Sequence, residues 1–392
     1  MRNQPVTREE TRRRRLQEIW THLHNHPEPS MKEYGTSEYL AELLGTAGLT
    51  IGKFGTIPGF TADVGQGTPR IGLRADMDAL VQEVAGKTAV VHSCGHDANM
   101  AVVATVMLEL AEQAEQLKCA VRAIFQPAEE LGNGADLVAA LGVTDGLEYL
   151  FGVHLRPQSE LPSPFLAPSI SHGACLFAYG TITGDDHHGA RPHLGANAVE
   201  VALEISAGLK RLKVDPQVPS SAKMTLLQAG GGNLNVIPGS GTFGVDLRAQ
   251  TNEAMSTLHT GLVGVCRSVA ALTGSEINLD FRDAVPAAII GIKAEDALAS
   301  AITATLGSDH LQSGIVTSGS DDFHFYTQRN PALQAAMLAV GANVRPGLHH
   351  PSMTFEAAAL ERAVGVLIEA CSRAAAPSAV ARSITCPRTS AA

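Results

Sequence analysis

The chain has 392 residues, which is too long for one ordinary domain core and predicts two or three domains. It carries 29 basic and 39 acidic residues, which disfavours nucleic-acid binding as its main role, because phosphate binding requires clustered Lys and Arg. No segment approaches the roughly 18 apolar residues of a membrane span, and the charged residues 1–20 lack the apolar stretch of a secretory signal. We therefore expect a cytoplasmic protein that binds neither nucleic acid nor membrane.

Helices and strands alternate through the first part of the chain. Residues 9–48 are expected to form one or two helices, and Thr7 with Glu10 reads as a capping box at the start. Further expected elements are strands at 60–64 and 70–74, a helix at 98–116, a strand at 119–125, a helix at 131–141 and a strand at 150–154. This alternation predicts a mostly parallel sheet covered by helices.

A different order of strands and helices follows in the middle of the chain. The expected order is a strand at 176–183, a helix at 197–212, strands at 223–228 and 242–248, a helix at 253–272 and a strand at 277–282. This β-α-β-β-α-β order is the ferredoxin-like split motif and predicts an inserted α+β domain. We therefore expect a catalytic domain built from residues 1–176 and 291–392, interrupted by a second domain at 177–290.

Potential metal ligands gather at predicted strand ends and loops. They fall in four clusters: His92-Ser-Cys94-Gly-His96-Asp97, Glu129-Glu130, His154 and His349-His350. In α/β proteins, sites form beyond the carboxyl ends of the strands. A thiolate, imidazoles and a carboxylate together suit Zn, Mn, Co or Ni better than Mg or Ca. Taken singly, each cluster has a structural alternative: a buried thiol, a histidine whose hydrogen bonds are made within the protein, or a solvent-exposed pair of carboxylates.

Several short strings along the chain match the motifs of a known family. They include LRADMDAL (73–80), HSCGHDANM (92–100), FQPAEE (125–130), GVHLRP (152–157), HGARPH (188–193), NVIPG (235–239) and LHHPSMTF (348–355). With these strings the chain resembles the M20 metallopeptidase/amidohydrolase superfamily and, within it, the branch of N-acyl-amino-acid, indole-acetyl-amino-acid and hippurate amidohydrolases. The resemblance extends from about residue 12 to 372 and implies a zinc-peptidase-like catalytic domain with an inserted lid that mediates dimers.

The resemblance implies roles for the clustered residues. Glu129 would be the general base, and Asp97 and Asp76 would orient His96 and its neighbours from outside the metal site. One or two divalent ions per subunit (Mn, Zn, Co or Ni) would be bound, with His350 a weaker rival of His349. The implied metal ligands are Cys94, His96, Glu130, His154 and His349.

Three residues of the inserted domain match family positions that act on the substrate. His188 would help to stabilise the oxyanion, often in the active site of the partner subunit of a homodimer. Asn235 and Arg248 would hold a substrate carboxylate, for which a bidentate guanidinium is well suited. Arg248 alternatively forms a structural ion pair.

Three functions remain open at this point. The favoured one is a metal-dependent amidohydrolase that cleaves the amide C–N bond of an N-acyl or N-aroyl amino acid with a metal-activated water and a Glu base. Two departures from the family pattern, Asp185-Asp186-His187 before the lid histidine and Asn99 in the metal string, leave the substrate uncertain. A hydrolytic deaminase of a small aromatic amine is the alternative, and an inactive ligand-binding member is less favoured.

Overall fold

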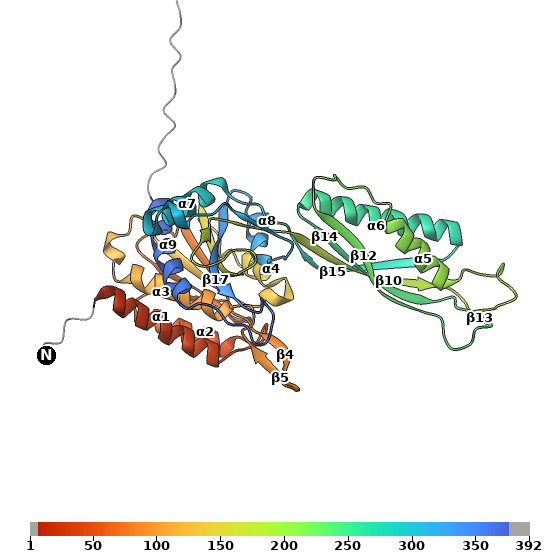
Figure 1. The fold of residues 1–392 in the computed structure, drawn as a ribbon, viewed down its shortest axis with the longest axis horizontal. Helices are drawn as coiled ribbons and strands as arrows, with labels where there is room; N and C mark the ends of the chain where they lie inside the picture. The colour runs from red at the N-terminus through yellow and green to blue at the C-terminus, as the bar shows by residue number, and fades with distance from the viewer. Residues whose placement is uncertain (1–6, 376–392) are drawn as a thin grey trace, which may run out of the picture.

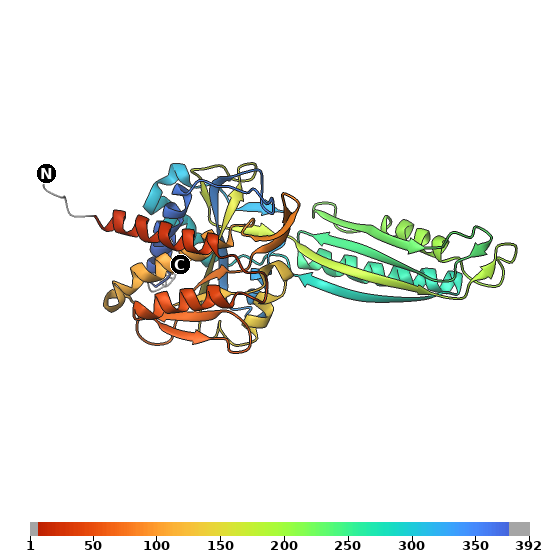
Figure 2. The same cartoon turned by 90° about the horizontal axis from the view of Figure 1, so that it is seen from below.

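The computed structural model describes residues 7–375, which form two domains placed end to end (Figure 1). The α/β domain holds both ends of the described chain. The second domain, residues 174–285, projects from it as an elongated body, and a view turned by 90° shows the same arrangement (Figure 2). No helix within residues 7–375 is long and apolar enough to cross a membrane.

A seven-stranded sheet forms the centre of the α/β domain. Its four inner strands pair in parallel, as expected, and its outer pairings are antiparallel. Parallel inner strands place their carboxyl ends at one edge of the sheet. The strand order is β1 (Thr50–Lys53), β2 (Phe60–Val64), β6 (Val121–Gln126), β3 (Ile71–Asp76), β7 (Tyr149–Pro157), β17 (Gln334–Val344) and β8 (Leu166–Ala167).

Helices bury both faces of this sheet. Side chains alternate along a strand, so Leu338 of β17 packs into one core and the adjacent Met337 into the other. The larger core includes α1 (Arg8–Asn25), α2 (Tyr34–Thr46), α3 (His96–Ala111), α7 (Ile292–Leu306) and α9 (Ala358–Ala374). The smaller core includes α4 (Gly134–Ala139) and α8 (Phe325–Arg329). The expected capping box at Thr7 and Glu10 is present at the start of α1.

The second domain is an antiparallel sheet of order β12-β14-β10-β15 with two helices, as the split motif predicts. It has a hydrophobic core of its own. Its elements are β10 (Ala174–Thr183), α5 (Ala198–Leu209), β12 (Ser220–Ala229), β14 (Gly241–Ala249), α6 (Asn252–Thr273) and β15 (Glu276–Val285). A small sheet of β11 (His187–His188) and β13 (Val236–Ile237) lies at its far tip (Figure 1).

Two local features differ from the sequence expectation. A hairpin of β4 (Leu80–Val84) and β5 (Lys87–Val91) lies between β3 and α3, where no element was expected. The helix expected at 131–141 shortens to α4, because the chain first makes a tight turn after Glu129. Gly134 closes this turn so tightly that a Cβ there would lie 1.8 Å from the carbonyl oxygen of Pro127.

Candidate active site

A cleft of about 730 Å³ lies between the two domains, beyond the carboxyl ends of the inner strands. The α/β domain contributes Cys94, Glu129, Glu130, His154 and His349 to its walls, and the second domain contributes other side chains, Arg248 among them. The cleft therefore collects most of the residues that the sequence singled out from segments far apart along the chain.

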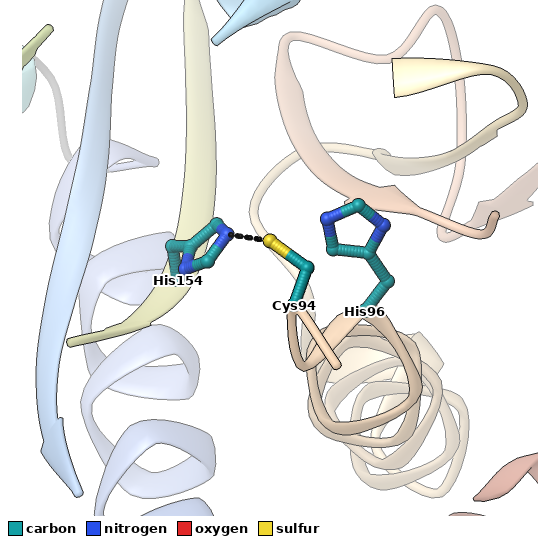
Figure 3. A group of neighbouring side chains, drawn as sticks. All are labelled: Cys94, His96 and His154. Carbon is teal, nitrogen blue, oxygen red and sulfur yellow. Dashed lines mark hydrogen bonds between the residues drawn. The ribbon is translucent and has the colours of Figure 1, made fainter. Parts of the chain in front are cut away.

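Cys94, His96 and His154 face one another (Figure 3), and Cys94 and His154 also line the cleft. The Cys94 Sγ lies 3.6 Å from His154 Nε2, and the potential ligand atoms of all three lie within 4.8 Å of one another. Gly95 precedes α3 with a φ of +90°, a left-handed conformation that glycine adopts without strain. This turn lets the thiol before the helix and the imidazole at its start face the same site.

Glu130 and His349 form a second group with the same thiol. The Glu130 Oε1 lies 3.5 Å from His349 Nε2, and Cys94, Glu130 and His349 also bring their ligand atoms within 4.8 Å of one another. Cys94 thus belongs to both groups, as a residue shared by two ions would. The ring of His350 instead accepts a hydrogen bond from the backbone N–H of Ser352, which leaves His349 as the better candidate.

The chemistry of these side chains fits a bound divalent metal. The buried His96 Nε2 and Glu130 Oε1 have no hydrogen-bond partner. Burial raises the pKa of Cys94 and of Glu130 and lowers the pKa of His154 to about 4, so His154 is a neutral imidazole at pH 7. A divalent cation would satisfy the orphaned atoms and favour the thiolate and carboxylate forms. The structure therefore brings all five predicted ligands around one place.

Glu129 stands beside this cluster without belonging to the two groups that share Cys94. Its Oε2 lies 3.8 Å from His96 Nε2, and its side chain lines the cleft. Burial, reinforced by the charges of Asp321 and Glu130, raises the pKa of Glu129 well above its usual range. A partly buried carboxylate that faces the cleft next to potential metal ligands is placed as a general base would be.

Asp78 is a site residue that the sequence reasoning missed. Its backbone carbonyl accepts a hydrogen bond of 2.8 Å from His96 Nδ1, which directs His96 Nε2 toward the cluster. Its two carboxylate oxygens accept the backbone N–H groups of Glu129 and Glu130, each at 3.0 Å. The sequence contained a hint of this role, because Asp78 lies two residues after Asp76, the last residue of the buried strand β3.

Asp76 lies near His96, and Asp97 does not act as expected. The Asp76 Oδ2 is 3.8 Å from His96 Nε2. The Asp97 carboxylate instead accepts hydrogen bonds from Trp20 Nε1 at 3.0 Å and His24 Nδ1 at 2.7 Å. Successive side chains on a helix point about 100° apart, so Asp97 faces α1 while His96 faces the site. This corrects the expectation that Asp97 orients His96; Asp78 holds His96 instead.

A buried arginine pairs with acidic residues beneath the cluster. Arg74 is 1% exposed and donates to Asp76 at 2.5 Å, to Asp322 at 2.8 Å and to Gln126 at 2.8 Å. Several carboxylates there lie close enough to bind a cation, but Arg74 already supplies the positive charge. The sequence reasoning gave Arg74 and Asp322 no role.

Arg248 faces the cleft from β14. Its guanidinium lies 5.3 Å from the ring centroid of Phe177, and its Nε donates to Asp246 at 2.8 Å. The ion pair foreseen as an alternative is therefore present, yet Arg248 also lines the cleft. The two interpretations of this residue are compatible.

His188 and Asn235 are not brought to the cleft within one chain. Both are exposed on the β11–β13 tip, at the end of the second domain far from the α/β domain (Figures 1 and 2). The His188 Nδ1 accepts the backbone N–H of Ala190 at 3.0 Å, and the Asn235 carbonyl accepts that of Gly189 at 2.6 Å. Their catalytic and substrate-binding roles stay predictions.

Known proteins similar to this chain identify its family. Residues 72–373 match the model of Peptidase family M20/M25/M40. The chain belongs to this family. It is 30% identical to a probable hydrolase of Synechocystis, over 88% of this chain and 92% of the relative. It is 27% identical to the N-acetyl-L-cysteine deacetylase of Bacillus subtilis, over 91% and 87%, and 29% identical to an IAA-amino acid hydrolase of Arabidopsis thaliana, over 79% and 73%.

Solved structures agree with this membership. The Bacillus subtilis YXEP protein, a dinuclear metal binding peptidase from the M20 family, is 25% identical and superposes with a TM-score of 0.77, covering 92% of this chain and 98% of that one. The aminobenzoyl-glutamate utilization protein of Klebsiella pneumoniae, 20% identical, shares the fold with a TM-score of 0.72 over 93% and 97%. Together with the family match, these likenesses make this M20 chain a metal-dependent amidohydrolase.

Proposed function

We propose that this M20 member hydrolyses the amide C–N bond of an N-acyl or N-aroyl amino acid. The observation that carries the proposal is the cleft, which has Glu129 and four of the five potential metal ligands on one side and Arg248 on the other, with the fifth ligand, His96, buried next to Cys94. Its volume of about 730 Å³ is in the range of small-molecule sites. The deacetylase and IAA-amino acid hydrolase activities of relatives support the same substrate class.

Each residue group has a separate task in this reaction. One or two ions of Mn, Zn, Co or Ni would be held by the potential ligands Cys94, His96, Glu130, His154 and His349. When bound, such ions polarise the scissile carbonyl and lower the pKa of a bound water. The Glu129 carboxylate would take a proton from the attacking water and would pass it to the leaving amine nitrogen. Arg248 binds the substrate carboxylate through charge-assisted hydrogen bonds and so positions the amide above the cluster.

We further propose that the active protein is a cytoplasmic homodimer, joined through its second domain. The tip that carries His188 and Asn235 is directed away from the α/β domain of its own chain (Figure 1). A partner subunit would bring these residues to the cleft of the other chain, where His188 can donate to the developing oxyanion. The edge strand β12 also exposes Leu226 and Leu227, apolar side chains that a partner would cover.

The test is a product assay on protein loaded with each of the four metals and supplied with a panel of acylated and aroylated amino acids. We expect a free amino acid to be released from at least one conjugate, detected with ninhydrin, and no release after chelation. Ammonia released from a small aromatic amine, without cleavage of any conjugate, would instead support the deaminase. No hydrolysis and no metal bound would support the inactive ligand-binding member.

A further inference from the structure

The turn that carries Glu129 and Glu130 is strained at its start. Ala128 immediately precedes the two glutamates and has a φ of +57°, a left-handed conformation that residues with a Cβ rarely adopt. Such conformations persist only where the surrounding structure holds them, and they cluster at functional sites. The contacts that hold Ala128 therefore bear directly on where the Glu129 carboxylate points.

One buried carboxyl group holds this strained residue. The Glu33 side chain is fully buried, and its Oε1 accepts the backbone N–H of Ala128 at 2.8 Å. Its Oε2 has no hydrogen-bond partner. With Asp78 bound to the next two N–H groups, three consecutive backbone donors of this turn end on buried carboxyl oxygens.

Both carboxyl groups depend on the loop between α1 and α2. Glu33 ends that loop, and Ser30 within it donates to Asp78 Oδ2 at 2.6 Å. The loop is fixed to the end of β3, because the Ala79 N–H donates to the Glu28 carbonyl at 2.9 Å. An N-terminal segment without any predicted catalytic residue thus supports the turn from outside the cleft.

We propose that Glu33 is a positioning residue for Glu129: by accepting the Ala128 N–H, it holds the left-handed turn that directs the Glu129 carboxylate into the cleft. This inference rests on the proposed role of Glu129 as the base. Glu33 does not line the cleft, so its effect on catalysis passes through the backbone of Ala128. The essential feature is an acceptor oxygen, which a glutamine at this position also provides.

The test compares Glu33→Met, which removes the acceptor but keeps the size of the side chain, with Glu33→Gln, which keeps it. We expect Glu33→Met to lower kcat roughly 10- to 100-fold with KM and metal content little changed, and Glu33→Gln to restore most of the lost activity. The matched control is Glu109→Met, because Glu109 is another buried carboxylate, on α3, that pairs with Arg8 at the other end of the domain. A wild-type kcat in Glu33→Met, or an equal loss in Glu33→Gln, would overturn the inference.

Backbone hydrogen exchange gives a readout that needs no substrate. We expect the Ala128 amide of the wild-type protein to be protected as well as those of Glu129 and Glu130, and to exchange faster in Glu33→Met. An unprotected Ala128 amide in the wild-type protein would refute the inference even if Glu33→Met failed to fold. Glu129→Gln, assayed in parallel, separates the two proposals: if it keeps its activity, the base assignment fails, whereas the exchange result still decides whether Glu33 holds the turn.

Discussion

The α/β domain and the second domain differ in how complete their parts of the site are. In the α/β domain, five potential metal ligands, Glu129 and the groups that hold them all come together within one chain. In the second domain, Arg248 reaches the cleft, while His188 and Asn235 lie exposed at the tip. The predicted metal-binding part of the site is therefore complete within one chain, whereas the predicted substrate-binding part is not.

This difference follows from what each half must do. Metal ligands need fixed geometry, and here Asp78 is a buried support that holds His96 and the backbone of Glu130. A substrate must enter and leave, so the groups that close over it are better placed on a separate domain or a second subunit. The following experiments test this difference between the two domains.

The largest effect is expected for Glu129→Gln. Loss of the general base should lower kcat by about 10²- to 10⁴-fold, while bound metal is retained. The matched comparison is Glu130→Gln, which should lose metal as well as activity, since Glu130 is the carboxylate next to His349. Metal analysis and steady-state kinetics distinguish the two, and equal metal loss in both variants would contradict the division of roles.

His188→Ala should lower kcat by roughly 10²- to 10³-fold if His188 is an oxyanion donor. Because it is proposed to act across subunits, mixing His188→Ala with Glu129→Gln chains should restore activity. Each mixed dimer then has one intact site, so about a quarter of wild-type activity is expected at random assortment. No recovery after subunit exchange, verified by light scattering and tagged chains, would contradict the two-chain site.

A smaller effect is expected for Arg248→Ala. Loss of a charge-assisted contact to the substrate carboxylate should raise KM by roughly 10- to 100-fold and change kcat less. Arg282 offers a matched control, because it pairs with Asp280 and stacks on Tyr179 at 4.8 Å in the same sheet but does not line the cleft. Similar kinetics for Arg248→Ala and Arg282→Ala would show that Arg248 is only structural.

The smallest effect concerns stability and pH. The hydrogen bond to Asp97 raises the pKa of His24 above its ordinary value of 6.5, so protonated His24 stabilises the folded chain. This contribution is fully present below the unfolded pKa and is lost as pH rises through the higher folded value. Urea unfolding of wild type and His24→Ala should therefore show a difference in unfolding free energy that shrinks as pH rises. A difference independent of pH would contradict this.

The fold was largely predictable because hydrophobic periodicity and family motifs are features of short stretches of sequence. The elements of the second domain lie within a few residues of their expected positions, because both helices and the strands β10 and β14 each bury one clear face. The hairpin β4–β5 was missed because half-exposed residues give a weak alternation. The expected helix at 131–141 was too long because a tight turn after Glu129 precedes it. That turn depends on tertiary contacts, which a local sequence pattern does not reveal.

The grouping of the candidate metal ligands was predictable from the sequence, whereas the residues that support them were less so. The candidate metal ligands are recognisable from their clusters taken together, whereas the roles of Asp78 and Glu33 depend on backbone N–H groups far along the chain. Asp97 was predicted to orient His96, its neighbour in sequence. The helix instead directs the Asp97 side chain toward Trp20. Residues that act through the backbone leave little signal in a single sequence.

The most direct test of the account is a cobalt(II) titration of chelator-treated protein, followed by the thiolate-to-metal charge-transfer absorption. The account predicts a band that saturates at one or two ions per chain and is absent in Cys94→Ser, since the thiol of Cys94 lies within both groups of ligands. Failure to bind cobalt, or an unchanged band in Cys94→Ser, would contradict the proposed metal centre.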